Sequence, residues 1–279
     1  MDVTKKKELE LWAHKIRRTA LKTIQTAGSG HIGGSFSIAE ILSVLYFDKM
    51  NVDPKNPGQA DRDRLVLSKG HCTPTMYATL ALRGFFPEEH LSTFRKIDSD
   101  LSGHVEIHVP GVDMSAGSLG QGLSVALGMA LYAKNKKQGN HVYCIMGDGE
   151  IQEGQIWEAA MAAGFYKADN LIAFVDNNKL QLDGSLEEVM SPYPIGEKFK
   201  AFGWNVIEAD GNNVEALVGA VEQALATEGK PTVIVADTVK GKGVSVFENQ
   251  VRFHGGQPSA EEWKTAYEEL DRKIAELEG

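Results

Sequence analysis

Asp148 lies between two glycines in the tetrapeptide GDGE (residues 147–150), directly after the apolar run HVYCIM. Asn178 closes a second polar group, DNN, thirty residues later and directly after the apolar run LIAFV. Carboxylate and amide oxygens are ligands that Mg²⁺ and Ca²⁺ take, with phosphate and water completing the shell. The spacing therefore predicts a divalent cation that bridges a diphosphate. A plain strand-to-helix turn at GDGE stays open as the alternative, because motif matches alone are hypotheses.

Two other phosphate-binding motifs fail on the positions of their residues. A dinucleotide fingerprint needs G-x-G-x-x-G, but the glycines here are Gly147, Gly149 and Gly154, so the third is misplaced. A P-loop needs Ser or Thr after Gly-Lys, and GKG at 241–243 lacks it. The sequence therefore favours neither nucleotide-binding motif.

Four histidines stand beside glycines in segments that we predict to be loops. They are His31 in GSGHIGG, His71 in SKGH, His104 in SGH and His254 in FHGG. A single histidine is more often a surface group or a satisfied core residue, but four in this setting indicate function together. Imidazoles suit the binding of sugar hydroxyls and proton transfer near neutral pH.

The elements that must position these groups are short apolar strands that alternate with amphipathic helices. Strands are expected at 64–71, 141–147, 170–176, 204–210 and 231–239. Helices are expected at 5–26, 37–50, 74–83, 120–137, 153–167, 213–227 and 259–279. This alternation predicts an α/β fold, a parallel sheet with helices on both faces. The polar groups follow the strands, and the ligand crevice of such a sheet lies at the carboxyl ends of its strands.

Local signals place several boundaries. AGSGHIGGS (27–35) predicts a loop, and 84–118 is also expected to be mostly loop. Ser37 is expected to cap the next helix, with Glu40 at the capping-box position, and Ser259 to cap the terminal helix. No repeat or linker divides the sequence, so residues 1–279 are expected to form a single domain.

Composition narrows the class of protein. AVILMFWYC makes up 42% and charged residues 24%, as in soluble globular proteins. The net charge of −9 argues against general binding of nucleic acid or anionic membranes. Cys72 and Cys144 have no metal-site spacing and are expected to be buried thiols in a reducing compartment. No signal-peptide core and no membrane-spanning apolar run occurs, so a cytoplasmic protein is predicted.

The ordered motifs resemble one family. GDGE followed by DNN resembles the thiamine diphosphate signature. Further segments resemble transketolases specifically: AGSGHIGGSFS, LSKGH, SGHVE, MSAGSLGQGLSVALGMA and KGKGVSVFE…FHG. The resemblance implies thiamine diphosphate and Mg²⁺ as cofactors, with Ca²⁺ or Mn²⁺ as substitutes. It also implies the diphosphate-binding type of the thiamine diphosphate fold.

The resemblance assigns roles around the diphosphate. Asp148 and Asn178 match side-chain ligands of the metal, and Leu180 matches a ligand through its backbone carbonyl. Gly147 and Gly149 match residues near the diphosphate.

The four histidines match catalytic residues of the family. His71 and His254 correspond to histidines around the cofactor phosphates and the reacting carbon. His31 and His104 correspond to histidines that bind donor-sugar hydroxyls. The remaining matches are Gly117, Ser118 and Leu119 beside the aminopyrimidine, and Glu153, which contacts its counterpart across a subunit interface. Ile32 and Val105 replace prolines that often follow the first and third histidines, which affects loop stiffness rather than chemistry.

One-chain transketolases have three domains, of which this sequence resembles the first. The resemblance therefore implies the N-terminal subunit of a split transketolase, which transfers a two-carbon ketol unit from a ketose (phosphate) to an aldose (phosphate), as in the pentose phosphate pathway. A separate partner subunit would supply the pyrimidine-binding domain with its activating glutamate, and self-association would give a heterotetramer.

Three alternatives stay open. The first is a related thiamine diphosphate enzyme, such as a deoxyxylulose-phosphate synthase or a 2-oxo acid dehydrogenase subunit. The second is a split transketolase specialised for an unusual sugar. The third is a non-catalytic binding or regulatory subunit, against which the intact Asp148, Asn178 and histidines argue.

Overall fold

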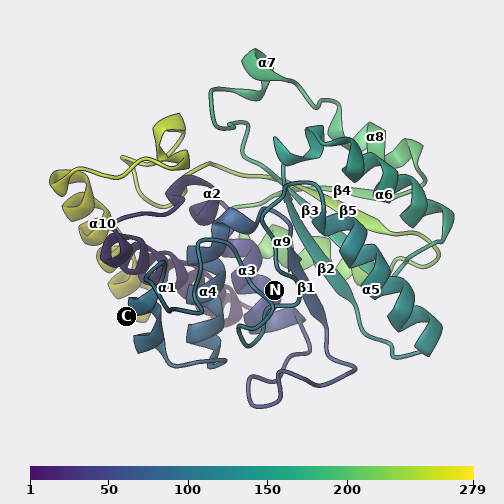
Figure 1. Ribbon diagram of the computed structural model, residues 1–279, viewed down its shortest axis with the longest axis horizontal. Helices are drawn as coiled ribbons and strands as arrows, with labels where there is room; N and C mark the ends of the chain where they lie inside the picture. Colours follow the sequence, from purple (N-terminus) through teal and green to yellow (C-terminus); the bar gives the residue numbers. More distant parts are fainter.

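One parallel sheet organises the computed structural model, which describes residues 1–279 (Figure 1). Its five strands run in the order β1-β2-β3-β5-β4, and all neighbours pair in parallel. The strands are β1 (Arg64–Leu67), β2 (Val142–Gly147), β3 (Leu171–Asn177), β4 (Asn205–Asp210) and β5 (Thr232–Asp237). The predicted α/β class and all five expected strands are confirmed.

Four of the five strands bury apolar side chains on both faces, because successive side chains point to opposite sides of the sheet, and the apolar side chains of the edge strand β4 are only partly buried. Ile145 and Phe174, which pair in register, face a first core with α1, α3, α4 and α9. Cys144 and Val175 face a second core with α5, α6 and α8. The helices are α1 (Val3–Ala27), α3 (Ala39–Val44), α4 (Thr73–Arg83), α9 (Val214–Leu225), α5 (Gly122–Lys136), α6 (Gly154–Phe165) and α8 (Ile195–Ala201).

A third core lies away from the sheet. It joins α1, α2 (Ile32–Phe36) and α10 (Ala260–Glu278) to the segment that follows β5, through Phe36, Val244, Phe247 and Leu270. Ser259 begins α10 with the predicted capping box, in which Glu262 is the reciprocal partner. This core fixes the segment between β5 and α10, which carries Lys240 and His254.

Three local predictions are wrong. The glycine-rich stretch 27–35 is not all loop, because α2 begins at Ile32. Ser37 caps no helix: its hydroxyl donates to Gly34 O (3.0 Å) and to Asp176 Oδ2 (2.7 Å). Glu40 binds Arg17 instead of closing a capping box. The expected helix 37–50 therefore divides into α3 and a π-helical turn.

The sequence did not predict α7 (Leu186–Val189) or α8. The segment 84–118 is mostly loop, as expected, with one 3₁₀ turn at Glu88–Thr93. Shorter 3₁₀ turns follow strand ends or precede helices, at Gly70–Cys72, Glu150–Gln152 and Val251–His254. None of the helices combines the length and the apolarity that a bilayer crossing needs.

The Arg17–Glu40 pair allows a test of the first core. Both side chains are buried, Arg17 also donates to Phe36 O (2.9 Å), and Asn212 donates to Glu40 Oε2 (3.1 Å). Glu40→Gln leaves the guanidinium buried without a counter-charge, so we expect the free energy of unfolding to fall by about 3–5 kcal/mol. Chemical denaturation at neutral pH measures it. Glu268→Gln, in an exposed pair with Lys264, is the control and should change stability by less than about 1 kcal/mol; equal losses would contradict the prediction.

Candidate active site

A cavity of about 320 Å³ lies at the carboxyl ends of β2 and β3, beside the end of β1. Nine of the predicted site residues line it: His71, Leu119, Gly147, Asp148, Gly149, Glu153, Asn178, Leu180 and His254. A separate cavity of about 460 Å³, between α1 and the turn Glu88–Thr93, contains none of them. Polar residues that follow separate strands therefore line one crevice, as expected.

Asp148 follows β2 and is almost fully buried. Its carboxylate accepts backbone N–H groups from both sides of the crevice, Gly149 N to Oδ1 (2.8 Å) and Lys179 N to Oδ2 (2.5 Å). Burial, and after it the nearby Asp176 carboxylate, raise the pKa of Asp148 to about 7. A bound cation would favour the ionised form of this carboxylate.

Asn178 and Leu180 face the same cavity from the turn after β3. The Asn178 side chain donates to Asp176 Oδ2 (2.9 Å), and its Oδ1 accepts Leu180 N (3.2 Å). Lys240 Nζ donates to Leu180 O (3.0 Å) and lies 3.2 Å from His254 Nδ1. Burial, and after it the nearby Lys69 ammonium, lower the pKa of Lys240 to about 8.

These atoms fit a hard divalent cation. Asp148, Asn178 and Leu180 offer one carboxylate, one amide oxygen and one backbone carbonyl, all oxygen ligands of the kind that Mg²⁺ takes. No group of three or more His, Cys, Asp or Glu side chains could hold a metal by itself. The set therefore fits a metal that takes its remaining ligands from phosphate and water.

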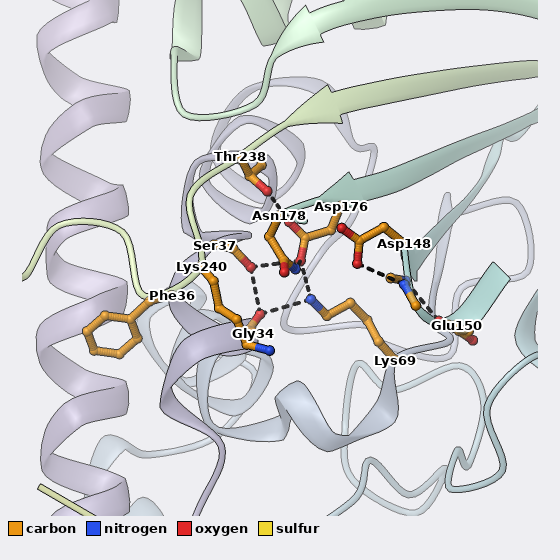
Figure 2. Close-up of polar contacts among 12 residues, drawn as sticks. Gly34, Phe36, Ser37, Lys69, Asp148, Glu150, Asp176, Asn178, Thr238 and Lys240 are labelled. Carbon is orange, nitrogen blue, oxygen red and sulfur yellow. Dashed lines mark hydrogen bonds and ion pairs between the residues drawn. The ribbon is translucent and has the colours of Figure 1, made fainter. Parts of the chain in front are cut away.

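Asp176, at the end of β3, joins the segments around the cavity (Figure 2). It is fully buried, and its carboxylate accepts hydrogen bonds from Ser37, Asn178 and Thr238. The same carboxylate forms an ion pair with Lys69. Burial alone would raise the pKa of Asp176, but Lys69 and the other donors hold it below its usual value. The sequence patterns assign no role to Asp176, Lys69 or Lys240. The one local signal for each is that it is a charged residue at or just after the end of an apolar strand.

Three of the four histidines form a cluster. The ring centroids of His31, His71 and His254 lie 5.0 to 5.6 Å apart. Burial lowers the pKa of His31 to about 4 and of His254 to about 3, and places the pKa of His71 well below its usual value. His104 lies at the exposed edge of the cluster, and its proximity contributes to the low pKa of His31. The three imidazoles of the cluster are therefore neutral at pH 7.

Comparison with known proteins gives the family. The model of the family "Transketolase, thiamine diphosphate binding domain" matches residues 9–275. The chain belongs to the transketolase family. The resemblance of its motifs to this family is thus confirmed, and with it a domain of the thiamine diphosphate-binding type.

Its relatives include proteins that are named as transketolase subunits. The chain is 48% identical over 269 residues to the 6-deoxy-6-sulfo-D-fructose transketolase subunit of Clostridium sp. (strain MSTE9), covering 96% of this chain and 98% of the relative. It is 44% identical over 270 residues to one of the subunits of the apulose-4-phosphate transketolase of Phocaeicola vulgatus, covering 97% and 96%. The assignment to one component of a split, transketolase-type transferase agrees with both names.

A solved transketolase shares the fold. The crystal structure of transketolase from Campylobacter jejuni superposes with a TM-score of 0.85 at 32% identity, covering 100% of this chain and 48% of that one. The chain thus spans about half the length of this one-chain transketolase.

The transketolase segment GSLGQG is held by a buried carboxylate. The Glu150 carboxylate accepts hydrogen bonds from the backbone N–H groups of Gly120 and Gly147 (both 2.9 Å). It also accepts one from the hydroxyl of Ser68. The Ser68 hydroxyl oxygen in turn accepts a hydrogen bond from the backbone N–H of Gly122 (3.1 Å). Burial raises the pKa of Glu150 above its usual value. The residues just before this anchor are exposed, namely Gly117, Ser118 and Leu119. Glu153 is also exposed, and its contact with a counterpart stays a prediction.

Glu150→Gln tests this anchor. An amide offers an N–H₂ group to one of the two backbone donors, so we expect faster hydrogen exchange at Gly120 and Gly147 and a loss of about 1–3 kcal/mol in stability. Exchange mass spectrometry of 117–122 measures the first effect. Glu158→Gln, on the exposed side of α6, is the matched control. Unchanged exchange in Glu150→Gln would show that the carboxylate does not hold the segment.

Proposed function

We propose that this chain is the diphosphate-binding subunit of a two-chain transketolase. The enzyme moves a two-carbon ketol unit from a ketose donor to an aldose acceptor with thiamine diphosphate and Mg²⁺. The observation that carries the proposal is that one cavity contains the oxygen ligands Asp148, Asn178 and Leu180 together with His71 and His254.

In this proposal Asp148, Asn178 and the carbonyl of Leu180 bind the Mg²⁺, and Gly147 and Gly149 leave room for the diphosphate. A side chain at Gly149 would approach Gln181 Oε1 to 3.1 Å. Thiamine diphosphate, when bound, supplies the nucleophilic carbon that the reaction needs. The protein contributes binding, orientation and proton transfer.

The neutral imidazoles suit proton transfer with sugar oxygens. The Lys240 ammonium donates to His254 Nδ1 (3.2 Å), which places the ring proton on Nε2, where it can be given to an oxygen of the substrate. His71 lies beside it, with ring centroids 5.3 Å apart. His31 and His104 then bind hydroxyls of the donor sugar.

A partner subunit completes the site. Leu119, at the end of the exposed segment Gly117–Leu119, and the exposed Glu153 line the cavity, on the side that a pyrimidine-binding domain would cover in this proposal. On α6, Met161 is 57% and Phe165 78% exposed, and apolar side chains exposed to this degree support a protein interface. Residues 1–279 act as one domain in this proposal, and contact between Glu153 and its copy gives a heterotetramer.

The substrate is the second question. The two-chain relatives are named for 6-deoxy-6-sulfo-D-fructose and for apulose 4-phosphate. These names support a split transketolase specialised for an unusual sugar over one that serves the pentose phosphate pathway.

Activity should require both subunits. We expect the purified chain alone to transfer no measurable ketol unit, and the co-purified pair to turn over, because in this proposal the partner subunit supplies the group that activates the cofactor. A coupled aldose-product assay with several ketoses measures the rate. Turnover by the chain alone at a rate typical of enzymes, about 1 s⁻¹ or more, would contradict the split-subunit proposal.

Asp148→Ala should abolish Mg²⁺-dependent binding of thiamine diphosphate. Loss of the carboxylate ligand is expected to weaken the binding of thiamine diphosphate at least about a hundredfold in calorimetric titrations with Mg²⁺ present. Mutating a residue that only supports a metal ligand already lowers metal affinity by about tenfold to a hundredfold. Asp183→Ala removes an exposed carboxylate that lines the same cavity and is the matched control. Unchanged affinity in Asp148→Ala would remove this residue from the metal site.

A further inference from the structure

Two neighbours hold the side-chain amide of Asn178 in one orientation. Its Nδ2 donates to Asp176 Oδ2 (2.9 Å), and its Oδ1 accepts the backbone N–H of Leu180 (3.2 Å). Turning the amide by 180° would bring its oxygen against the carboxylate and its amino group against another N–H donor. Because an amide oxygen has two acceptor positions, the observed orientation leaves one of them on Oδ1 for a further partner.

The amide of the preceding residue, Asn177, has different surroundings. It lines a separate cavity with Tyr193, whose hydroxyl donates to Asn177 Oδ1 (2.7 Å). Asn178 instead lines the cavity that contains Asp148 and Leu180. Of the two consecutive asparagines, Asn178 is therefore the one whose amide lies with the other proposed metal ligands.

Asp176 lies directly beside the Asn178 amide (Figure 2). Its side chain is fully buried and does not line the cavity. Its backbone oxygen accepts Asp148 N (3.2 Å), so the same residue contacts two of the three proposed metal ligands. Asp176 can thus act on a cation in the cavity only through the ligands that it holds.

The carboxylate of Asp176 is itself restrained. Oδ2, the oxygen that accepts the Asn178 amide, also accepts the hydroxyl of Ser37 (2.7 Å) and forms the ion pair with Lys69. Thr238 donates to the other oxygen, Oδ1. The carboxylate therefore cannot turn away from Asn178 without breaking several buried hydrogen bonds, which are costly to leave unmade.

We propose that Asp176 is the positioning residue of the metal site, whose carboxylate holds the Asn178 amide so that Oδ1, and not Nδ2, faces the divalent cation. Groups that hold a metal ligand from behind raise metal affinity by orienting that ligand. Because Asn178 Oδ1 also accepts Leu180 N, the orientation of the amide is coupled to the position of the third ligand. The proposal rests on the proposed function, since it takes Asp148, Asn178 and Leu180 as the ligands.

The test measures how much Mg²⁺ the chain needs in order to bind thiamine diphosphate. Calorimetric titrations of thiamine diphosphate into the full chain are repeated over a series of Mg²⁺ concentrations. Asp176→Asn is expected to raise the half-saturating Mg²⁺ concentration by about tenfold to a hundredfold. Affinity for thiamine diphosphate at saturating Mg²⁺ should change little. An unchanged Mg²⁺ requirement, or an equal loss of affinity at every Mg²⁺ concentration, overturns the proposal.

Exchanging the two side chains separates positioning from a structural role. Asn178→Asp alone places two carboxylates against each other, so weak Mg²⁺ binding is expected. Adding Asp176→Asn restores a donor and an acceptor with their roles reversed, and a carboxylate offers the cation an oxygen whichever way it turns. The double variant should recover most of the lost Mg²⁺ affinity, a coupling that independent sites do not show. If it needs as much Mg²⁺ as Asn178→Asp does, the proposal is wrong.

Thr238→Val is the matched control. It removes a hydrogen bond to Oδ1 of the same carboxylate and leaves the Asn178 contact in place, so stability should fall while the Mg²⁺ requirement stays that of the wild type. A requirement that rises as far as in Asp176→Asn would overturn the role of the Asn178 contact. Because Asp176→Asn leaves Lys69 buried without its counter-charge, the comparison of Asn178→Asp with the double variant decides the question if that single variant does not fold.

The failure of this proposal differs from the failure of the proposed function. Lack of ketol transfer by the wild-type two-chain protein would overturn the proposed function, even where thiamine diphosphate binds in a Mg²⁺-dependent manner. A Mg²⁺ requirement that Asp176→Asn does not change would overturn the positioning role, even where the pair transfers ketol units.

Discussion

The buried ion pair between Lys69 and Asp176 is the interaction on which the site depends. Asp176 ends the central strand β3, and its other donors come from Ser37 after α2, Asn178 on the next turn and Thr238 after β5. Each of these segments also carries a residue of the cavity. One carboxylate therefore sets the relative positions of four separate parts of the chain. Removing a partner from such a pair costs about 3–5 kcal/mol, because it leaves a charge buried without compensation.

Close packing of α2 brings His31 to this centre. A Cβ at Gly33 would lie 2.9 Å from Lys240 Cγ, and one at Gly34 would lie 3.1 Å from Cys72 Sγ and 3.3 Å from Lys69 Nζ. The two glycines let the helix lie against both lysines. They disfavour a helix by intrinsic propensity, so tertiary packing stabilises α2, and this explains why the pattern HIGGS predicts a loop.

The sequence predicts the parts of the site that follow from local rules. Apolar runs predict the strands, a parallel sheet puts their carboxyl ends together, and Asp148, Asn178 and His71 follow from that geometry. Ser37 was mispredicted because its hydroxyl can satisfy a local cap or a distant acceptor, and the acceptor, Asp176, lies 139 residues along the chain. Lys69 likewise finds its counter-charge 107 residues away. Sequence periodicity carries no information on such pairs.

The site has a rigid inner half and an open outer half. Asp148, Asp176 and Lys69 are buried and fully bonded within this chain. His104 and the segment Gly117–Leu119 are exposed. The three cores lie beneath and beside the inner half, and none includes the exposed segment. A chain built in this way can preorganise its metal ligands and histidines before any partner binds, because the buried Lys69–Asp176 pair that joins their segments is compensated within the chain. The partner then has to cover only the outer half, where the residues are already solvated, so association does not require the inner network to rearrange.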